Sequence, residues 1–109
     1  MKLSPNQNAV LDFAKLCTAD VATIPQLRRW INDYCNDQSG TNLKTNTLRW
    51  LIEWAEMKCV DRPMRFDGKV VRIFIVRNFT IDDVRNATPD AIREHLVRSN
   101  EFVEPIEGF

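Results

Sequence analysis

The spacing of apolar residues changes once along this 109-residue chain, and that change limits the folds open to it. Up to about residue 59, apolar side chains recur every three to four positions, which is typical of amphipathic helices. Over about 63–77 they alternate or run together with many β-branched residues, which is typical of strands. The sequence therefore predicts helices followed by a β-hairpin, in a chain long enough for one α+β domain.

Asp67-Gly68 lies between the two halves of the strand-like region and predicts the hairpin turn. Asp-Gly between β-branched flanks is the strongest short-range hairpin signal. Pro63 restricts the first arm to an edge position or a late start, because proline cannot donate to the ladder. The second arm, 69–77, is rich in valine and isoleucine, as a strand covered on one face would be.

Three helices are predicted before the hairpin, each from an apolar stripe at helical spacing. They are expected over about 5–17 and 24–35, and from a first turn at 46–49 to about residue 59. Ser4 and Thr23 each precede a proline in the expected first turn, which is a helix start signal, and Thr41 or Thr45 is expected to cap the third helix. Trp30 shares the stripe of the second helix and is assigned to the core.

The sequence becomes helical again beyond Asn78. Thr80 is expected to cap a short turn, and Thr88 with the proline after it predicts a last helix that reaches Ser99. Residues 101–109 show no period and combine carboxylates with apolar side chains. This segment indicates an arm that needs a partner surface.

The formal net charge of zero hides an uneven distribution. Residues 41–77 carry eight basic and four acidic side chains, a balance of +4, whereas residues 78–109 carry three arginines and seven carboxylates, a balance of −4. Such segregation favours a face for an anionic partner beside an acidic appendage. The alternative is an ordinary mixed surface on which the two excesses cancel.

The residues that most enzymes and metal sites need are scarce. The three cysteines form no C-x-x-C pair and are assigned as reduced structural thiols, and His95 is the one histidine of the sequence. The three glycines form no phosphate-binding loop. We expect no catalytic residues, no metal and no cofactor. No apolar run reaches the ~18 residues of a membrane span, so a cytoplasmic protein without a membrane partner is expected.

Three segments carry a resemblance to a known superfamily. Residues 3–11 read Leu-Ser-x-x-Gln-x-x-Val-Leu, residues 43–51 read Leu-Lys-Thr-Asn-Thr-Leu-Arg-Trp-Leu, and residues 57–60 read Met-Lys-Cys-Val. With the order helix, helix, helix, hairpin, residues 3–77 resemble the winged-helix DNA-binding superfamily. Two features depart from its usual pattern: Cys59, where these domains often have glycine, and the long loop 36–43.

The resemblance implies a winged helix-turn-helix domain over residues 1–78, with three helices and a β-hairpin wing. Residues 79–109 would be a helical, acidic C-terminal extension. The implied function is sequence-specific binding of double-stranded DNA by a small prokaryotic or phage-type transcriptional regulator.

The side chains expected on DNA follow from this placement and from their chemistry. Asparagine pairs with adenine and arginine with guanine, while lysine and threonine serve phosphates or bases. The candidates are Lys44, Thr45, Asn46, Thr47 and Arg49 on the third helix, Arg28 and Arg29 on the second, and Arg65 and Lys69 on the wing.

A second set of residues is expected at an interface, with a homodimer as the first interpretation. Trp50 and Trp54 cannot both face the core if the neighbouring Leu48 and Ile52 do. The acidic C-terminal extension also carries apolar side chains. The set is Trp50, Trp54, Ile92, Leu96, Phe102 and Phe109. The alternative function is a winged-helix protein-interaction module or inhibitor acting through the acidic tail and exposed tryptophans, which the pI of 6.6 favours.

Overall fold

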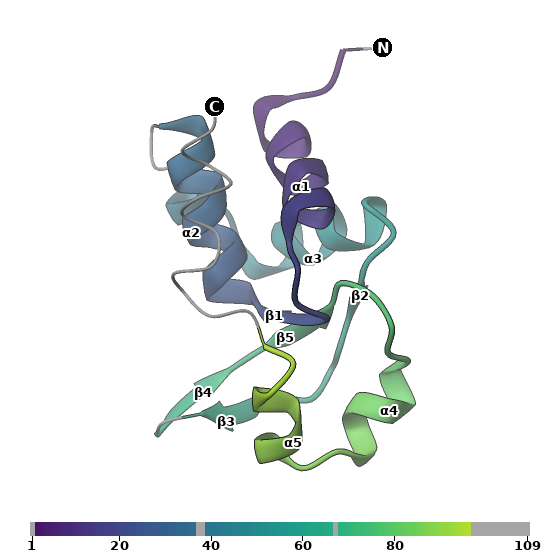
Figure 1. Ribbon diagram of the computed structural model, residues 1–109. Coiled ribbons are helices and arrows are strands. Elements are labelled where there is room, and N and C mark those ends of the chain that lie inside the picture. The colour runs from purple at the N-terminus through teal and green to yellow at the C-terminus, as the bar shows by residue number, and fades with distance from the viewer. Residues whose placement is uncertain (1, 37–38, 67, 97–109) are drawn as a thin grey trace.

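The computed structural model describes residues 2–36, 39–66 and 68–96, and within them the chain is an α+β fold, as expected (Figure 1). Helices α1–α3 lie on one side of a small sheet, and the β3–β4 hairpin with α4 and α5 lies on the other. The elements in chain order are α1 Pro5–Leu16, β1 Val21–Thr23, α2 Ile24–Cys35, η1 Ser39–Asn42, α3 Thr45–Trp54, β2 Lys58–Cys59, β3 Met64–Phe66, β4 Lys69–Val71, β5 Ile73–Ile75, α4 Ile81–Asn86 and α5 Pro89–Arg93.

Local capping interactions fix the starts of α1 and α2. The Ser4 hydroxyl accepts a hydrogen bond from the backbone N–H of Gln7 at 3.2 Å, and the Gln7 side chain accepts one from the Ser4 N–H at 3.0 Å. Thr23 and Gln26 form the same reciprocal pair at the start of α2. Both caps use the backbone donors that a helix start leaves unpaired, which confirms the two predicted starts.

The third helix differs from its prediction at both ends. Lys44 is the N-cap residue and its side chain makes no capping hydrogen bond, so neither expected threonine caps α3. The helix ends at Trp54 because Glu56 adopts a left-handed conformation, φ 66°, and the N–H groups of Glu56 and Met57 donate to the carbonyls of Glu53 and Ile52. This is a Schellman termination, usually made with glycine. Cys59 therefore lies in β2, and the predicted helical stripe reaching it is wrong.

The larger sheet is antiparallel with strand order β1-β5-β2. The hairpin β3–β4 is hydrogen-bonded separately, with Phe66 opposite Lys69, so the predicted hairpin is confirmed. Asp67 of the predicted turn lies outside the described residues. Gly68 has φ 79°, a conformation that favours glycine. The Val60 N–H donates to the Ile73 carbonyl at 3.1 Å and extends the pairing of β2 with β5 by one residue. Strand β1 was not predicted.

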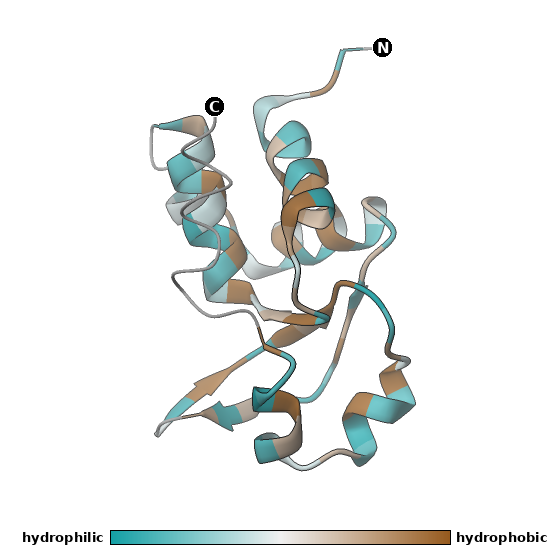
Figure 2. Cartoon of the chain, in the orientation of Figure 1, coloured by the Kyte–Doolittle hydropathy of each residue, from teal (hydrophilic) through white to brown (hydrophobic). Residues whose placement is uncertain are grey.

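Strand β5 divides the core, because its side chains alternate between the two faces of the sheet. Phe74 belongs to the cluster under α1–α3, here called the helical cluster, while Ile73 and Ile75 belong to the opposite cluster, here called the hairpin cluster. Figure 2 shows the hydrophobic segments of β1 and β5 between these two layers. The buried members of the helical cluster are Ala9, Val10, Phe13, Cys17, Ala22, Ile24, Leu27, Trp30, Ile31, Leu48, Leu51, Ile52, Met57, Cys59 and Phe74. Those of the hairpin cluster are Val21, Val60, Met64, Phe66, Ile73, Ile75, Val84 and Ile92.

The chain beyond residue 78 adds to the hairpin cluster. Thr80 and Thr88 cap α4 and α5, as predicted, and Val84 and Ile92 are buried. Helix α5 ends at Arg93, earlier than the predicted last helix, and Leu96 then forms a bridge with Val21 of β1. Up to residue 96, the expected C-terminal extension thus packs on the same sheet as the preceding domain.

Candidate nucleic-acid interface

The first turn of α3 presents four consecutive polar side chains to solvent. Lys44, Thr45, Asn46 and Thr47 are all exposed, because Leu48 and the apolar positions after it turn inward to the helical cluster. Four of the residues expected to contact DNA therefore lie together at the N-terminal end of one helix. The backbone N–H groups of that end add a partial positive charge.

The loop before α3 is held by side chains of α2. Asn32 both donates to the Thr41 hydroxyl at 2.8 Å and accepts from the Thr41 N–H at 2.9 Å. A Cβ atom at Gly40 would lie 2.4 Å from the backbone oxygen of Arg28, so only glycine allows this close approach without a shift of backbone. The loop fixes where α3 begins.

Arg28 and Arg29 take different positions on α2. Arg28 is half-buried and donates to the Leu43 carbonyl at 3.3 Å, so it helps hold the loop that leads into α3. The expected contact of Arg28 with DNA stays a prediction beside this structural role. Arg29 is exposed.

Arg49 is half-buried and paired, unlike the four residues before it. Its Nη2 lies 2.5 Å from Oδ1 of Asp61, in the connection between β2 and β3. This hydrogen bond raises the pKa of Arg49, and burial raises the pKa of the neighbouring Cys59 thiol to about 11. The structure therefore gives Arg49 a carboxylate partner within the chain, which the sequence had not indicated.

The hairpin alternates between buried and exposed side chains. Met64 and Phe66 are buried in the hairpin cluster, while Arg65 and Lys69 are exposed. Val70, the cross-strand partner of Arg65, is 58% exposed. The two basic side chains expected on the wing are thus available for contact, with an apolar residue beside them.

Two of the three tryptophans stand outside the core, as expected. Trp50 is 56% exposed and Trp54 is half-buried, and their rings stack with centroids 6.4 Å apart and an interplanar angle of 20°. Trp30 is buried, and its Nε1 donates to the Ala9 carbonyl at 2.8 Å. The predicted core role of Trp30 is confirmed.

The expected interface residues of the C-terminal part separate into three groups. Ile92 is buried within its own chain, which corrects its assignment to an interface, because α5 packs on the hairpin cluster. Leu96 is half-buried against the same cluster and pairs with β1. Phe102 and Phe109 lie outside the described residues.

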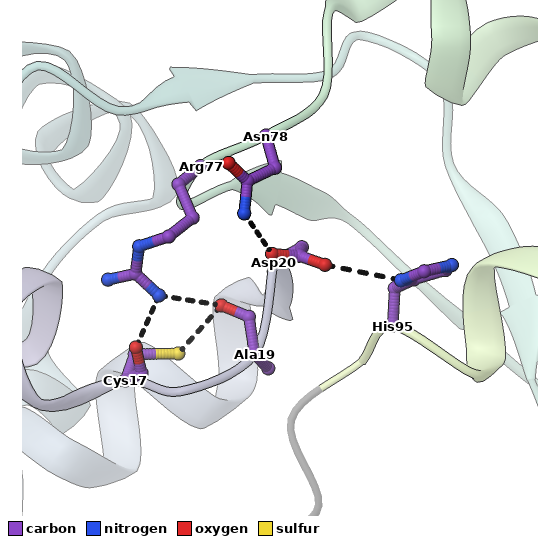
Figure 3. A network of polar contacts seen from close by, with 6 residues as sticks. All are labelled: Cys17, Ala19, Asp20, Arg77, Asn78 and His95. Carbon is purple, nitrogen blue, oxygen red and sulfur yellow. Dashed lines mark hydrogen bonds and ion pairs between the residues drawn. The ribbon is translucent and has the colours of Figure 1, made fainter.

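A polar network at the edge of the sheet was not foreseen (Figure 3). The Arg77 guanidinium donates to the carbonyls of Ala14, Cys17 and Ala19, and so satisfies backbone oxygens at the end of α1 and just beyond it. Asp20 accepts from the Asn78 amide at 2.9 Å and lies 3.2 Å from Nδ1 of His95. The partners are 58 to 75 residues apart in sequence, so no local pattern could indicate them. The network joins the end of α1 to the segment after β5 and to the turn after α5.

The described residues contain no cluster of three or more histidine, cysteine or acidic side chains that could hold a metal ion. The three cysteines are unbridged, with Cys17 and Cys59 buried, as expected for structural thiols. In the described part of the chain, no helix has the length and apolar character of a membrane span. Comparison with protein-family models, with curated proteins and with solved structures finds no match to this chain.

Proposed function

We propose that this chain is a sequence-specific double-stranded DNA-binding protein of the winged helix-turn-helix type, acting as a small transcriptional regulator. The observation that carries the proposal is the order α1-β1-α2-α3 followed by a sheet with strand order β1-β5-β2, from which the β3–β4 hairpin extends. In this arrangement α3 is the recognition helix and the hairpin is the wing.

The chemistry of the first turn of α3 supports this proposal. A recognition helix places its N-terminal side chains against base edges in the major groove. Asn46 offers the amide that pairs with adenine, and Lys44, Thr45 and Thr47 offer donors for bases or phosphates. Arg65 and Lys69 would hold the flanking backbone. A cytoplasmic homodimer on a palindromic site is part of the proposal, since two-fold pairing is common among such regulators.

The test is binding of labelled mixed-sequence and enriched genomic duplexes, measured by fluorescence anisotropy at two salt concentrations. Asn46→Ala should relax base preference at one position by ~1–3 kcal/mol, and Lys69→Ala should weaken all sequences alike and reduce the salt slope by about one. Lys15→Ala, an exposed change on α1, is the control. A double variant Asn46→Ala/Lys69→Ala that binds like the wild type would contradict the proposal.

The second candidate is a protein-interaction module, favoured by the exposed Trp50 and Val70. Exposed large apolar side chains are common at protein interfaces. The protein-interaction function is supported if the wild type binds no duplex at low salt. It is contradicted if Trp50→Ser leaves solubility and oligomeric state unchanged while Asn46→Ala relaxes base preference as expected above.

A further inference from the structure

Two arginines from separate helices pair with one carboxylate next to α3, and a third arginine is bonded to the backbone of the second. Asp61 lies 2.5 Å from Arg49 of α3 and 3.9 Å from Nη2 of Arg85 in α4. Arg62, the next residue in the chain, donates from Nη1 to the Arg85 carbonyl at 2.9 Å, which brings a third guanidinium to the same place. Arg62 and Arg85 are exposed and Arg49 is half-buried, and the Asp61 side chain, 66% exposed, lies between Arg49 and Arg85.

The cluster has more positive charge than its own carboxylate can neutralise. Two guanidinium groups, those of Arg49 and Arg85, pair with the single carboxylate of Asp61, which leaves an excess of one positive charge. The Arg62 guanidinium, bonded to the Arg85 carbonyl, adds a further positive charge beside this pair. The 3.9 Å separation leaves Arg85 in ion-pair contact with Asp61 but beyond hydrogen-bond distance, so its N–H donors are not committed to that carboxylate.

The chemistry of the cluster suits an oxyanion with several oxygens. A guanidinium presents parallel N–H donors that match a carboxylate or a phosphate, and two or more guanidiniums converging on one point are typical of phosphate recognition. Asp61 already occupies the position that such an anion would take between Arg49 and Arg85. In the protein alone, the carboxylate holds the two side chains oriented toward that position.

We propose that Arg49, Arg62 and Arg85 form a phosphate-binding site for the nucleic-acid backbone, in which Asp61 stands in for the phosphate until DNA binds. The inference rests on the proposed function. Asp61 and Arg62 lie between β2 and β3, where the chain passes from the sheet below α3 to the hairpin. The site therefore extends the proposed DNA surface to α4. Arg49 acts here on a phosphate, and not on the base edge that the sequence suggested.

The test measures the affinity of the full chain for a 24-base-pair mixed-sequence duplex between about 50 and 200 mM salt. Each neutralised phosphate adds about 0.9 to the slope of log K against log salt, so two contacts account for about a twelvefold loss of affinity over this range. Arg62→Gln/Arg85→Gln should therefore bind more weakly at low salt and lose about twelvefold less affinity on salt addition. Lys2→Gln/Lys15→Gln is the matched control, because it removes the same charge at exposed positions on or before α1.

Asp61→Asn supplies a result of opposite sign. This change keeps all three arginines and removes the competing carboxylate, so binding should become severalfold tighter at low salt with a steeper salt slope. A folding defect cannot imitate tighter binding, which keeps the test decisive if the double variant is unstable. Thermal unfolding followed by circular dichroism checks that each variant is folded.

The outcomes separate the site from the proposed function. If the duplex binds and Lys44 or Lys69 variants weaken it while Arg62→Gln/Arg85→Gln and Asp61→Asn behave like the wild type, the phosphate site is wrong and the DNA function stands. If the arginine variants alter the salt slope and the Lys44 and Lys69 variants do not, the phosphate site is supported. The assignment of the first turn of α3 and the hairpin as the DNA-contacting surface is then wrong. A wild type that binds no duplex overturns both.

Discussion

The two clusters on either face of the sheet are built in different ways. The helical cluster draws on α1, α2 and α3, which are 10 to 12 residues long. The hairpin cluster draws on strands of three residues and on α4 and α5, with six and five residues. Helices this short are marginal alone, so the second region depends on tertiary packing for nearly all of its order.

The most deeply buried aromatic side chains of the described residues, Trp30, Phe13 and Phe74, all lie in the helical cluster. Phe13 contacts Trp30 edge to face with centroids 5.6 Å apart, and lies at the same distance from Phe74. The hairpin cluster has Phe66 at its rim, with the Arg93 guanidinium 5.8 Å from the ring centroid. Because stability follows buried apolar contact, we expect the helical cluster to set global stability and the α5 region to open at lower free energy.

The largest expected effect is the loss of Trp30. Trp30→Ala removes a buried ring and the hydrogen bond to Ala9, so it should lower the free energy of unfolding by about 3–5 kcal/mol, measured by urea denaturation. Trp50→Ala is the matched control, because the same substitution at a 56% exposed ring should cost far less. Equal losses at the two tryptophans would break the assignment of global stability to the helical cluster.

The parts of the fold that the sequence could predict are those fixed by local interactions, and they occur in both clusters. The starts of α1 and α2 were predictable because Ser4 and Thr23 bond to residues three positions away. The end of α3 was not, since Glu56 takes a left-handed conformation that sequence patterns assign to glycine. Strand β1 was missed because its three residues show too little alternation, and it forms only by pairing with β5.

The candidate site divides in the same way. The exposed turn Lys44–Thr47 was predictable, because the apolar stripe of α3 fixes which side faces solvent. The partners of Arg28 and Arg49 were not, since Leu43 and Asp61 lie 15 and 12 residues away and meet them only through the fold. Arg85 was outside the predicted set because helical pattern gives no sign that α4 packs beside Asp61.

A smaller effect is expected from the hairpin cluster. Ile92→Ala removes a buried side chain from α5 and should lower the free energy of unfolding by about 2–3 kcal/mol. This value is near the low end for truncation of isoleucine, because a region made of short elements can relax around the cavity. Hydrogen exchange should show the loss mainly at amides of α5 and β1. Leu27→Ala, buried in α2, is the counterpart, for which protection should fall throughout the helical cluster. Uniform loss of protection in both variants would mean that the two clusters unfold as one unit.

The smallest effect tests a polar contact that ties α5 to the sheet. His95 lies beside Asp20 at 3.2 Å and its side chain is 42% exposed, so His95→Ala should cost only about 0.2–1 kcal/mol. The local readout is the Val21 amide, whose N–H donates to the His95 carbonyl at 3.1 Å. Faster exchange at the Val21 amide in His95→Ala, with an unchanged urea midpoint, would show that this contact holds α5 on the sheet locally. It would also show that the contact does not contribute to global stability. Glu94→Ala, at the exposed neighbouring position, should leave Val21 unchanged. If Glu94→Ala accelerates exchange at Val21 as much as His95→Ala does, the effect belongs to the turn after α5 and the polar contact with Asp20 contributes nothing of its own.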